Sequence, residues 1–122
     1  MTGVDIGHGF RALEFGPVTS TNDIARSLAD AGEAAGLFVA AEAQTAGRGR
    51  HGRSWQSPLG NLHATLILRP RRPMAEIATL SLVTALGLAQ AVEALSGGAV
   101  RPRLKWPNDV LIDGAKLAGI LL

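Results

Sequence analysis

The sequence predicts an α+β fold in which helices pack on a mixed β-sheet. Three features of the chain indicate this fold. Short runs that are apolar or alternate between apolar and polar residues have the length of strands, two longer stretches have the length of helices, and the order is strand, helix, strand, strand, helix, strands. This interleaved order favours a sheet covered by helices over a helical bundle or an all-β sandwich.

The first strand and helix are expected near the N-terminus. Residues 11–15 alternate weakly and predict a short strand. Ser20, followed three residues later by Asp23, resembles a capping box and predicts a helix N-terminus. The helix is expected to end near Gly32 or Gly36. Its apolar face is formed by Ile24, Ala25, Leu28 and Ala29.

Two further strands are expected in the middle of the chain, on either side of a long loop. Residues 37–43 form a continuous apolar run that ends at a polar segment, which is typical of a buried strand. Residues 44–61 have no period and predict a loop. Residues 62–68 alternate and include branched side chains, and the prolines of the following Arg-Pro-Arg-Arg-Pro segment end that strand.

One long helix and three short strands complete the prediction. Residues 74–95 are rich in Ala and Leu and predict the longest helix, which Ser96-Gly97-Gly98 ends. Asp113-Gly114 has the composition of a hairpin turn between the last two strands. The last apolar run breaks off in mid-strand, so the 122 residues are expected to be the N-terminal portion of one domain. The three strands are expected at 100–106, 110–113 and 116–122.

The composition of the chain excludes several classes of protein. The chain has 122 residues, 47% hydrophobic and 18% charged, which suffices for one modest core and is too apolar for a disordered tail. No apolar run approaches the roughly 20 residues that span a bilayer. The N-terminus has no basic flank and no apolar signal stretch, so a cytoplasmic protein without a membrane partner is predicted. Without cysteine, and with three scattered histidines, no metal held by the protein alone is expected.

Positive charge is concentrated in the middle of the chain. Six arginines and no acidic residue lie between Gln44 and Arg72. An anionic ligand would match this stretch, although a composition bias of the genome accounts for the arginine excess equally well. That bias does not explain the positions of Lys105 and Lys116, the only two lysines, which fall inside two unusual segments.

Residues 47–55, Gly-Arg-Gly-Arg-His-Gly-Arg-Ser-Trp, have the glycine spacing of a dinucleotide-binding loop. A Rossmann loop must open a helix, and Pro58 and Gly60 exclude one here. Glycines interleaved with arginines instead suit a loop that closes on an anion, because guanidinium groups bind phosphate and carboxylate bidentately. An Arg-Gly module that binds nucleic-acid phosphates, with Trp55 as a stacking platform, remains an alternative from composition alone.

Two segments near the C-terminal end place charge in apolar surroundings. Residues 105–109, Lys-Trp-Pro-Asn-Asp, put an amide and a carboxylate at a turn, and taken alone they also fit an ordinary strand end. Lys116 enters an otherwise apolar strand, where an unpaired ammonium is costly unless an anion meets it. A lysine whose amine reaches solvent from a strand end is the commoner case.

Four blocks in this order and spacing resemble the catalytic domain of the biotin-protein ligases, from about Phe15 to the last residue. The resemblance implies the α+β fold of that domain, which is similar to class II aminoacyl-tRNA synthetases. It also implies an ATP-dependent ligase that forms biotinyl-5′-adenylate and transfers biotin to a lysine of a biotin carboxyl carrier domain. The blocks are Ser20-Thr21-Asn22, residues 44–55, Lys105-Trp106-Pro107-Asn108-Asp109 and Lys116-Leu117-Ala118-Gly119.

The resemblance further implies roles for individual residues. Biotin, whose ureido ring has two N–H donors and a carbonyl acceptor, suits short hydroxyl and amide groups. It is expected to contact Ser20, Thr21, Asn22, Gln44, Gly47, Arg48, Gly49, Arg50 and Lys116. ATP and the adenylate are expected to contact Arg48, Arg50, Arg53, Trp55 and Asn108. The catalytic candidates are Arg50, Lys116 and Asp109, and Asp109 is also assigned a contact to the Mg²⁺ that accompanies ATP.

The chain also departs from larger members of that family. Few residues precede Phe15, so an N-terminal DNA-binding domain is not expected and nucleic acid is disfavoured as a partner. The small C-terminal domain and much of the adenine pocket are also expected to be missing, so this piece is expected to bind without turnover. A lipoate- or octanoate-protein ligase, which shares the fold, is the nearest alternative. A fragment that only associates with a missing half, and a homodimer formed through a sheet edge, are left open.

Overall fold

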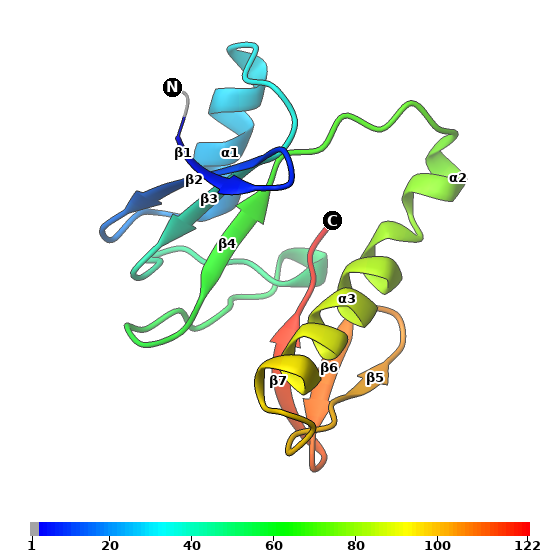
Figure 1. Cartoon of the computed structure of the whole chain (residues 1–122). Helices are drawn as coiled ribbons and strands as arrows, with labels where there is room; N and C mark the ends of the chain where they lie inside the picture. The colour runs from blue at the N-terminus through cyan, green and yellow to red at the C-terminus, as the bar shows by residue number, and fades with distance from the viewer. Residues whose placement is uncertain (1–2) are drawn as a thin grey trace. The chain divides into compact units, whose positions relative to one another are not determined.

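The computed structural model describes residues 3–122 (Figure 1), which divide into two compact units. The first unit ends at Arg69 and the second runs from Pro70 to Leu122. Helix α1 lies between β2 and β3 in the chain, and α2 and α3 lie between β4 and β5, so each unit consists of a sheet with a helix packed on it. The predicted α+β class is therefore confirmed, with the strands divided between two sheets.

The first unit contains a four-stranded mixed sheet in the order β1-β2-β3-β4. β1 pairs antiparallel with β2, β2 parallel with β3, and β3 antiparallel with β4. β1 was not predicted; it is joined to β2 through three consecutive residues, Gly7, His8 and Gly9, with φ of 92°, 55° and 81°. The strands span Val4–Gly7, Phe10–Phe15, Leu37–Ala41 and His63–Leu66.

Helix α1 (Thr21–Asp30) packs on β3 and β4. Ser20 is its N-cap, and the Ser20 hydroxyl accepts a hydrogen bond from the backbone N–H of Asp23 at 3.0 Å, which confirms the predicted helix start. Gly32, with φ of 96°, follows the last turn as predicted. The core of this unit contains Ala25, Leu37, Val39 and Ile67, against which the rest of the predicted apolar face of α1 packs.

The helical stretch of the second unit is divided into α2 (Met74–Ile77) and α3 (Leu80–Leu95), where one helix was predicted. The break falls at Thr79, whose hydroxyl donates to the carbonyl oxygen of Glu76 at 2.6 Å. A hydroxyl that bonds to the backbone in this way competes with the regular helical pattern. α3 ends at Leu95, and Ser96 is its C-cap, before Gly97 and Gly98.

The second sheet is antiparallel, in the order β5-β6-β7. Asp113 and Gly114 connect the last two strands with φ of 50° and 79°, the positive values of a type I′ hairpin turn, as predicted. α3 packs on β5 and β6, and the core contains Ala85, Ala89 and Val110. The strands span Arg103–Lys105, Asp109–Ile112 and Ala115–Gly119.

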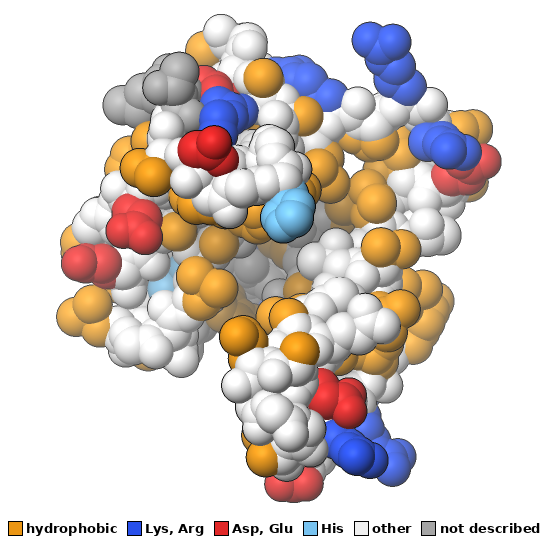
Figure 2. Space-filling view, in the orientation of Figure 1, with side chains coloured by type: hydrophobic (Ala, Val, Ile, Leu, Met, Phe, Trp, Pro, Cys, Tyr) orange, Lys and Arg blue, Asp and Glu red, His pale blue; other side chains and the backbone are white. Residues whose placement is uncertain are grey.

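Much of the apolar surface of α3 is exposed (Figure 2), including Val83 at 61% and Leu86 at 49%. By length and composition alone, Met74–Leu95 could cross a membrane, because it contains 18 consecutive residues with a mean hydropathy of 1.5. The expectation that no apolar run approaches this length was therefore wrong. The hydroxyl residues of the stretch, such as Ser81 and Thr84, lower its mean hydropathy only slightly, and its charged residues are limited to Glu76 and Glu93.

Candidate ligand-binding site

Three of the predicted biotin-binding residues meet in one amide and hydroxyl cluster at the N-terminus of α1. The backbone N–H of Thr21 donates to Oε1 of Gln44 at 2.8 Å, and the Thr21 hydroxyl lies 2.8 Å from the hydroxyl of Thr65. Thr65 in turn donates to Oδ1 of Asn22 at 2.5 Å. Thr65, on β4, was not predicted. The cluster of Thr21, Asn22, Gln44 and Thr65 is called the amide–hydroxyl cluster below.

The hydrogen bonds of this cluster determine which hydroxyl group donates and which accepts. A hydroxyl has one proton, so if Thr65 donates to Asn22, the hydroxyl of Thr21 must donate to Thr65. The Thr21 hydroxyl also lies 3.2 Å from Oε1 of Gln44, but the backbone N–H of Thr21 already supplies that oxygen with a donor. The cluster is therefore a pre-oriented set of short polar groups, of the kind that recognises a small polar ring.

Residues 44–57, called the Gly–Arg loop below, pair with themselves like a narrow hairpin. Gln44 faces Ser57 and Arg48 faces Ser54 in isolated antiparallel bridges. The backbone N–H of Trp55 donates to Gly47 at 2.9 Å. The tip is a single 3₁₀ turn, Arg50–Gly52, and no α-helix follows it. The dinucleotide-loop interpretation therefore stays excluded, because that loop has to open a helix.

Gly47 is buried at the base of this loop for a steric reason. A Cβ on Gly47 would lie 2.5 Å from Oγ of Ser57, 2.7 Å from the carbonyl oxygen of Trp55 and 2.9 Å from Nε2 of Gln44. Real Cβ atoms do not come that close to other heavy atoms. The predicted ligand residue Gly47 thus lets the loop approach the side chain of Gln44. Gly49 is less crowded, with its nearest neighbour at 3.7 Å.

Arg48 is held by Asp23, an acidic residue that was expected only to cap helix α1. Nη2 of Arg48 lies 2.9 Å from Oδ1 of Asp23, in the first turn of α1. The hydrogen bond from Arg48 is the largest cause of a lowered pKa of Asp23; burial opposes it, and hydrogen bonds from Thr19 and Ser20 add to it. This ion pair connects the Gly–Arg loop to the helix that carries Thr21 and Asn22.

The lowered pKa of Asp23 predicts an acid-sensitive contact. Because the folded-state pKa lies below the unfolded one, the stabilisation is complete above the unfolded pKa and is lost as pH falls through the folded value. We expect NMR titration to give a pKa for Asp23 below that of an ordinary aspartate, and Arg48→Ala to raise it. An unchanged pKa in Arg48→Ala would contradict the ion pair. Arg53→Ala, which removes a neighbouring arginine, is the matched control.

The remaining predicted residues of the first unit differ in exposure. Ser20 is buried as the helix cap, with 2% of its surface exposed. Arg50 and Arg53 are exposed on the loop tip and just after it. Trp55 is 36% exposed. The arginine side chains of the tip are thus accessible to an anion from solvent.

In the second unit, the predicted catalytic residues Asp109 and Lys116 form an ion pair. Nζ of Lys116 lies 3.0 Å from Oδ1 of Asp109, an oxygen that is shielded from solvent and accepts no hydrogen bond of good geometry from the residues that the structure describes. The two residues lie on the adjacent strands β6 and β7. The charge of Lys116, expected to need an anion, therefore meets a carboxylate of its own sheet.

Asn108 also has a partner within the second unit. Its side-chain amide donates to the carbonyl oxygen of Ile120 at 2.9 Å, and the backbone N–H of Ile120 donates back to Asn108 at 2.9 Å. This pair fixes the end of β7 to the start of β6. Lys105 and Trp106 are exposed, and the Trp106–Pro107 peptide bond is cis.

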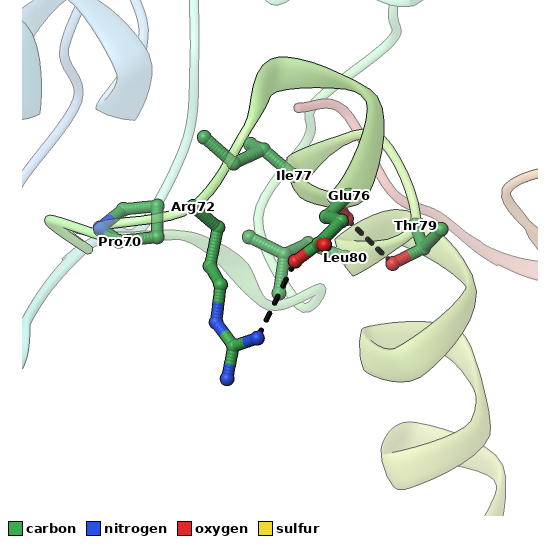
Figure 3. A pocket seen from close by; sticks show the side chains of 6 residues that line it. All are labelled: Pro70, Arg72, Glu76, Ile77, Thr79 and Leu80. Carbon is green, nitrogen blue, oxygen red and sulfur yellow. Dashed lines mark hydrogen bonds and ion pairs between the residues drawn. The ribbon is translucent and has the colours of Figure 1, made fainter.

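A separate pocket of about 340 Å³ lies beside α2 (Figure 3). Its lining includes an exposed ion pair in which Arg72 lies 3.4 Å from Glu76. No predicted site residue lines this pocket. Within residues 3–122, no three His, Cys, Asp or Glu side chains gather in a way that could hold a metal ion. The pocket is lined by Pro70, Arg72, Glu76, Ile77, Thr79 and Leu80.

Comparison with known proteins decides the family. Residues 15–122 match the biotin/lipoate A/B protein ligase family, which is nearly the whole chain. The chain belongs to this family. The predicted resemblance is confirmed over the stretch for which it was expected.

Relatives of this biotin/lipoate ligase chain include two curated bacterial proteins. The chain is 50% identical over 103 residues to the biotin–[acetyl-CoA-carboxylase] ligase of Paracoccus denitrificans, covering 84% of this chain and 42% of that protein. It is 40% identical over 128 residues to the ligase of the same name from Mycobacterium tuberculosis, covering 97% of this chain and 46% of that protein. The chain thus spans less than half the length of these relatives.

Two solved structures support the fold of this ligase-family chain. The biotin protein ligase of Aquifex aeolicus in complex with biotin and ATP has a TM-score of 0.78 and 33% identity, covering 90% of this chain and 45% of that one. The biotin protein ligase of Leishmania major in complex with biotinyl-5-AMP has a TM-score of 0.77 and 34% identity, covering 90% and 50%.

Proposed function

We propose that this chain provides biotin- and nucleotide-binding residues of an ATP-dependent biotin-protein ligase. The observation that carries the proposal is the amide–hydroxyl cluster, whose Gln44 also lies at the base of the Gly–Arg loop. The cluster supplies short donors and acceptors for a ureido ring, and the loop supplies guanidinium groups for the anions of the reaction. The names of the relatives favour biotin over lipoate or octanoate.

The proposed reaction has two steps. A carboxylate oxygen of biotin attacks the α-phosphorus of ATP, and pyrophosphate leaves with the electrons of the broken P–O bond. The lysine amine of a biotin carboxyl carrier domain then attacks the acyl carbon of the adenylate, AMP leaves, and the amine loses a proton. The overall conversion turns ATP, biotin and apo-carrier into AMP, pyrophosphate and biotinylated carrier.

The arginines of the loop suit the first step, in which two anions approach each other. The exposed side chains of Arg48 and Arg50 can bind phosphate and carboxylate, reducing the repulsion where charge develops. To bind the ligand, Arg48 would either break its ion pair with Asp23 or use the N–H groups that do not contact Asp23. Arg53 and Trp55 are proposed to support the adenylate. A closed loop would shield the mixed anhydride from water.

Lys116 is proposed to bind the carboxylate of biotin through its ammonium group. Its pairing with Asp109 suggests that Asp109 orients the ammonium group. The ammonium of Lys116 engages Oδ1 of Asp109, so a Mg²⁺ contact of Asp109 would have to use the second carboxylate oxygen, Oδ2, where the nearby positive charge of Lys116 opposes a metal ion. Mg²⁺ would then be held mainly by the phosphates of ATP, and no step is assigned to Asp109 through it. Asn108, whose amide donates to Ile120, is proposed to contact ATP only through its remaining polar atoms.

Isothermal titration tests this function. Biotin is titrated, with and without ATP and Mg²⁺, into this chain and into a chimera in which the remainder of the Paracoccus denitrificans relative follows Leu122. We expect the chimera to bind biotin and release pyrophosphate, and this chain alone to bind without turnover. Binding of lipoate or nucleic acid in place of biotin would refute the proposal. A carrier-domain partner, a cytoplasmic location and a place for residues 1–122 at the N-terminal side of the catalytic domain remain predictions.

A further inference from the structure

Ser57 contacts both the amide–hydroxyl cluster and the backbone of the Gly–Arg loop. It is buried, with 5% of its surface exposed. Its Oγ accepts a hydrogen bond from Nε2 of Gln44 at 2.9 Å and donates one to the carbonyl oxygen of Trp55 at 3.1 Å. The single proton of this hydroxyl is thus donated to the backbone carbonyl of Trp55, and a lone pair of Oγ accepts the N–H of Gln44.

These contacts allow only one orientation of the Gln44 amide. The backbone N–H of Thr21 can only donate, so the group of Gln44 that faces it must be the oxygen Oε1. Nε2 then faces Ser57, which can accept because its proton goes to Trp55. The flipped amide would set two donors against each other at Thr21 and leave two acceptors facing each other at Ser57.

We propose that Ser57 is a positioning residue that makes Gln44 a hydrogen-bond donor toward the ligand. Oε1 is flanked by the backbone nitrogen of Thr21 at 2.8 Å and by the Thr21 hydroxyl oxygen at 3.2 Å, so the second N–H of Nε2 is the group left to meet a ligand acceptor, which for biotin is the ureido carbonyl. Gly47 supports this arrangement, because only a residue without Cβ leaves room for the contact between Ser57 and Gln44. The identity of the ligand rests on the proposed function; the orientation of Gln44 does not.

A double-mutant cycle tests the contact itself. Ser57→Ala, Gln44→Ala and the double variant are compared by urea unfolding, and ¹⁵N NMR follows the side-chain amide of Gln44. We expect the two substitutions to be non-additive and the amide signals of Gln44 to shift in Ser57→Ala. Ser54→Ala, an exposed serine of the same loop, should leave those signals unchanged. Additive effects with unshifted signals would overturn the proposal.

Ligand titration tests the donor role. The probes are biotin and 2-iminobiotin, in which an imine nitrogen replaces the ureido oxygen. Ser57→Ala is expected to weaken biotin binding about fivefold and to narrow the preference for biotin over 2-iminobiotin. In a chain that already carries Gln44→Ala, Ser57→Ala should not weaken biotin binding further. If Ser57→Ala weakens biotin binding equally in that chain, or leaves the preference for biotin over 2-iminobiotin unchanged, the donor role is wrong. One outcome separates the two proposals. If neither the unsubstituted chain nor the chimera binds biotin, but the effects of Ser57→Ala and Gln44→Ala on unfolding are non-additive, then the proposed function and the donor role are both wrong. The contact between Ser57 and Gln44 is confirmed in that case.

Discussion

Lys116→Gln is expected to lower biotin affinity about 30-fold, equivalent to about 2 kcal/mol, because it removes the ammonium proposed to meet the ligand carboxylate. It also leaves the shielded oxygen of Asp109 without its partner at 3.0 Å. A moderate loss of stability, about 1 kcal/mol, is expected from that change, since Lys116 itself is partly exposed. Isothermal titration and urea unfolding measure the two effects separately.

The second lysine of the chain provides the matched control. Lys105→Gln removes an exposed ammonium from β5 and should change neither quantity. The double variant Asp109→Asn/Lys116→Gln should recover the stability lost in Lys116→Gln but not the affinity. Recovery of biotin affinity in the double variant would show that Lys116 acts only by neutralising Asp109.

Gly47→Ala is expected to destabilise the first unit by about 2 kcal/mol and to abolish measurable biotin binding. The added methyl group would lie 2.7 Å from the carbonyl oxygen of Trp55, a backbone atom that cannot rotate away. It would also displace Gln44 and Ser57 from each other. Thermal unfolding and biotin titration of the variant measure the two effects.

Gly49→Ala distinguishes this steric effect from a general effect of alanine in the loop. The Cβ of Ala at position 49 would meet its nearest neighbours at ordinary contact distance, 3.7 Å or more. We expect Gly49→Ala to retain most of the stability. Equal losses in the two variants would indicate that the flexibility of the loop, and not the close approach at Gly47, requires glycine.

Local patterns predicted the elements whose signals lie within a few residues of each other. Ser20 and Asp23 are three residues apart, so their capping contact could be predicted from the sequence. The turn at Asp113-Gly114 could be predicted for the same reason. β1 was missed because its four residues, Val-Asp-Ile-Gly, are too short to show alternation and all are exposed.

The residues that complete the candidate site are distant in sequence from those they contact. Thr65 lies 44 residues from Thr21, and on its strand it looks like any β-branched residue. Ser57 follows Gln44 by 13 residues, in a loop without a period. Asp23 was predicted as a cap, but its pairing with Arg48 depends on how the loop folds back on α1. Such contacts depend on tertiary structure, which a single sequence shows only through a family resemblance.

The shared position of Gln44 has a thermodynamic consequence. Gln44 belongs both to the amide–hydroxyl cluster and to the bridge with Ser57 that closes the base of the Gly–Arg loop. A ligand that holds Gln44 in its bound orientation therefore also favours the paired state of the loop. Linkage makes this effect reciprocal: whatever orders the tip at Arg50, such as an anion bound there, must raise the affinity for the first ligand by the same factor.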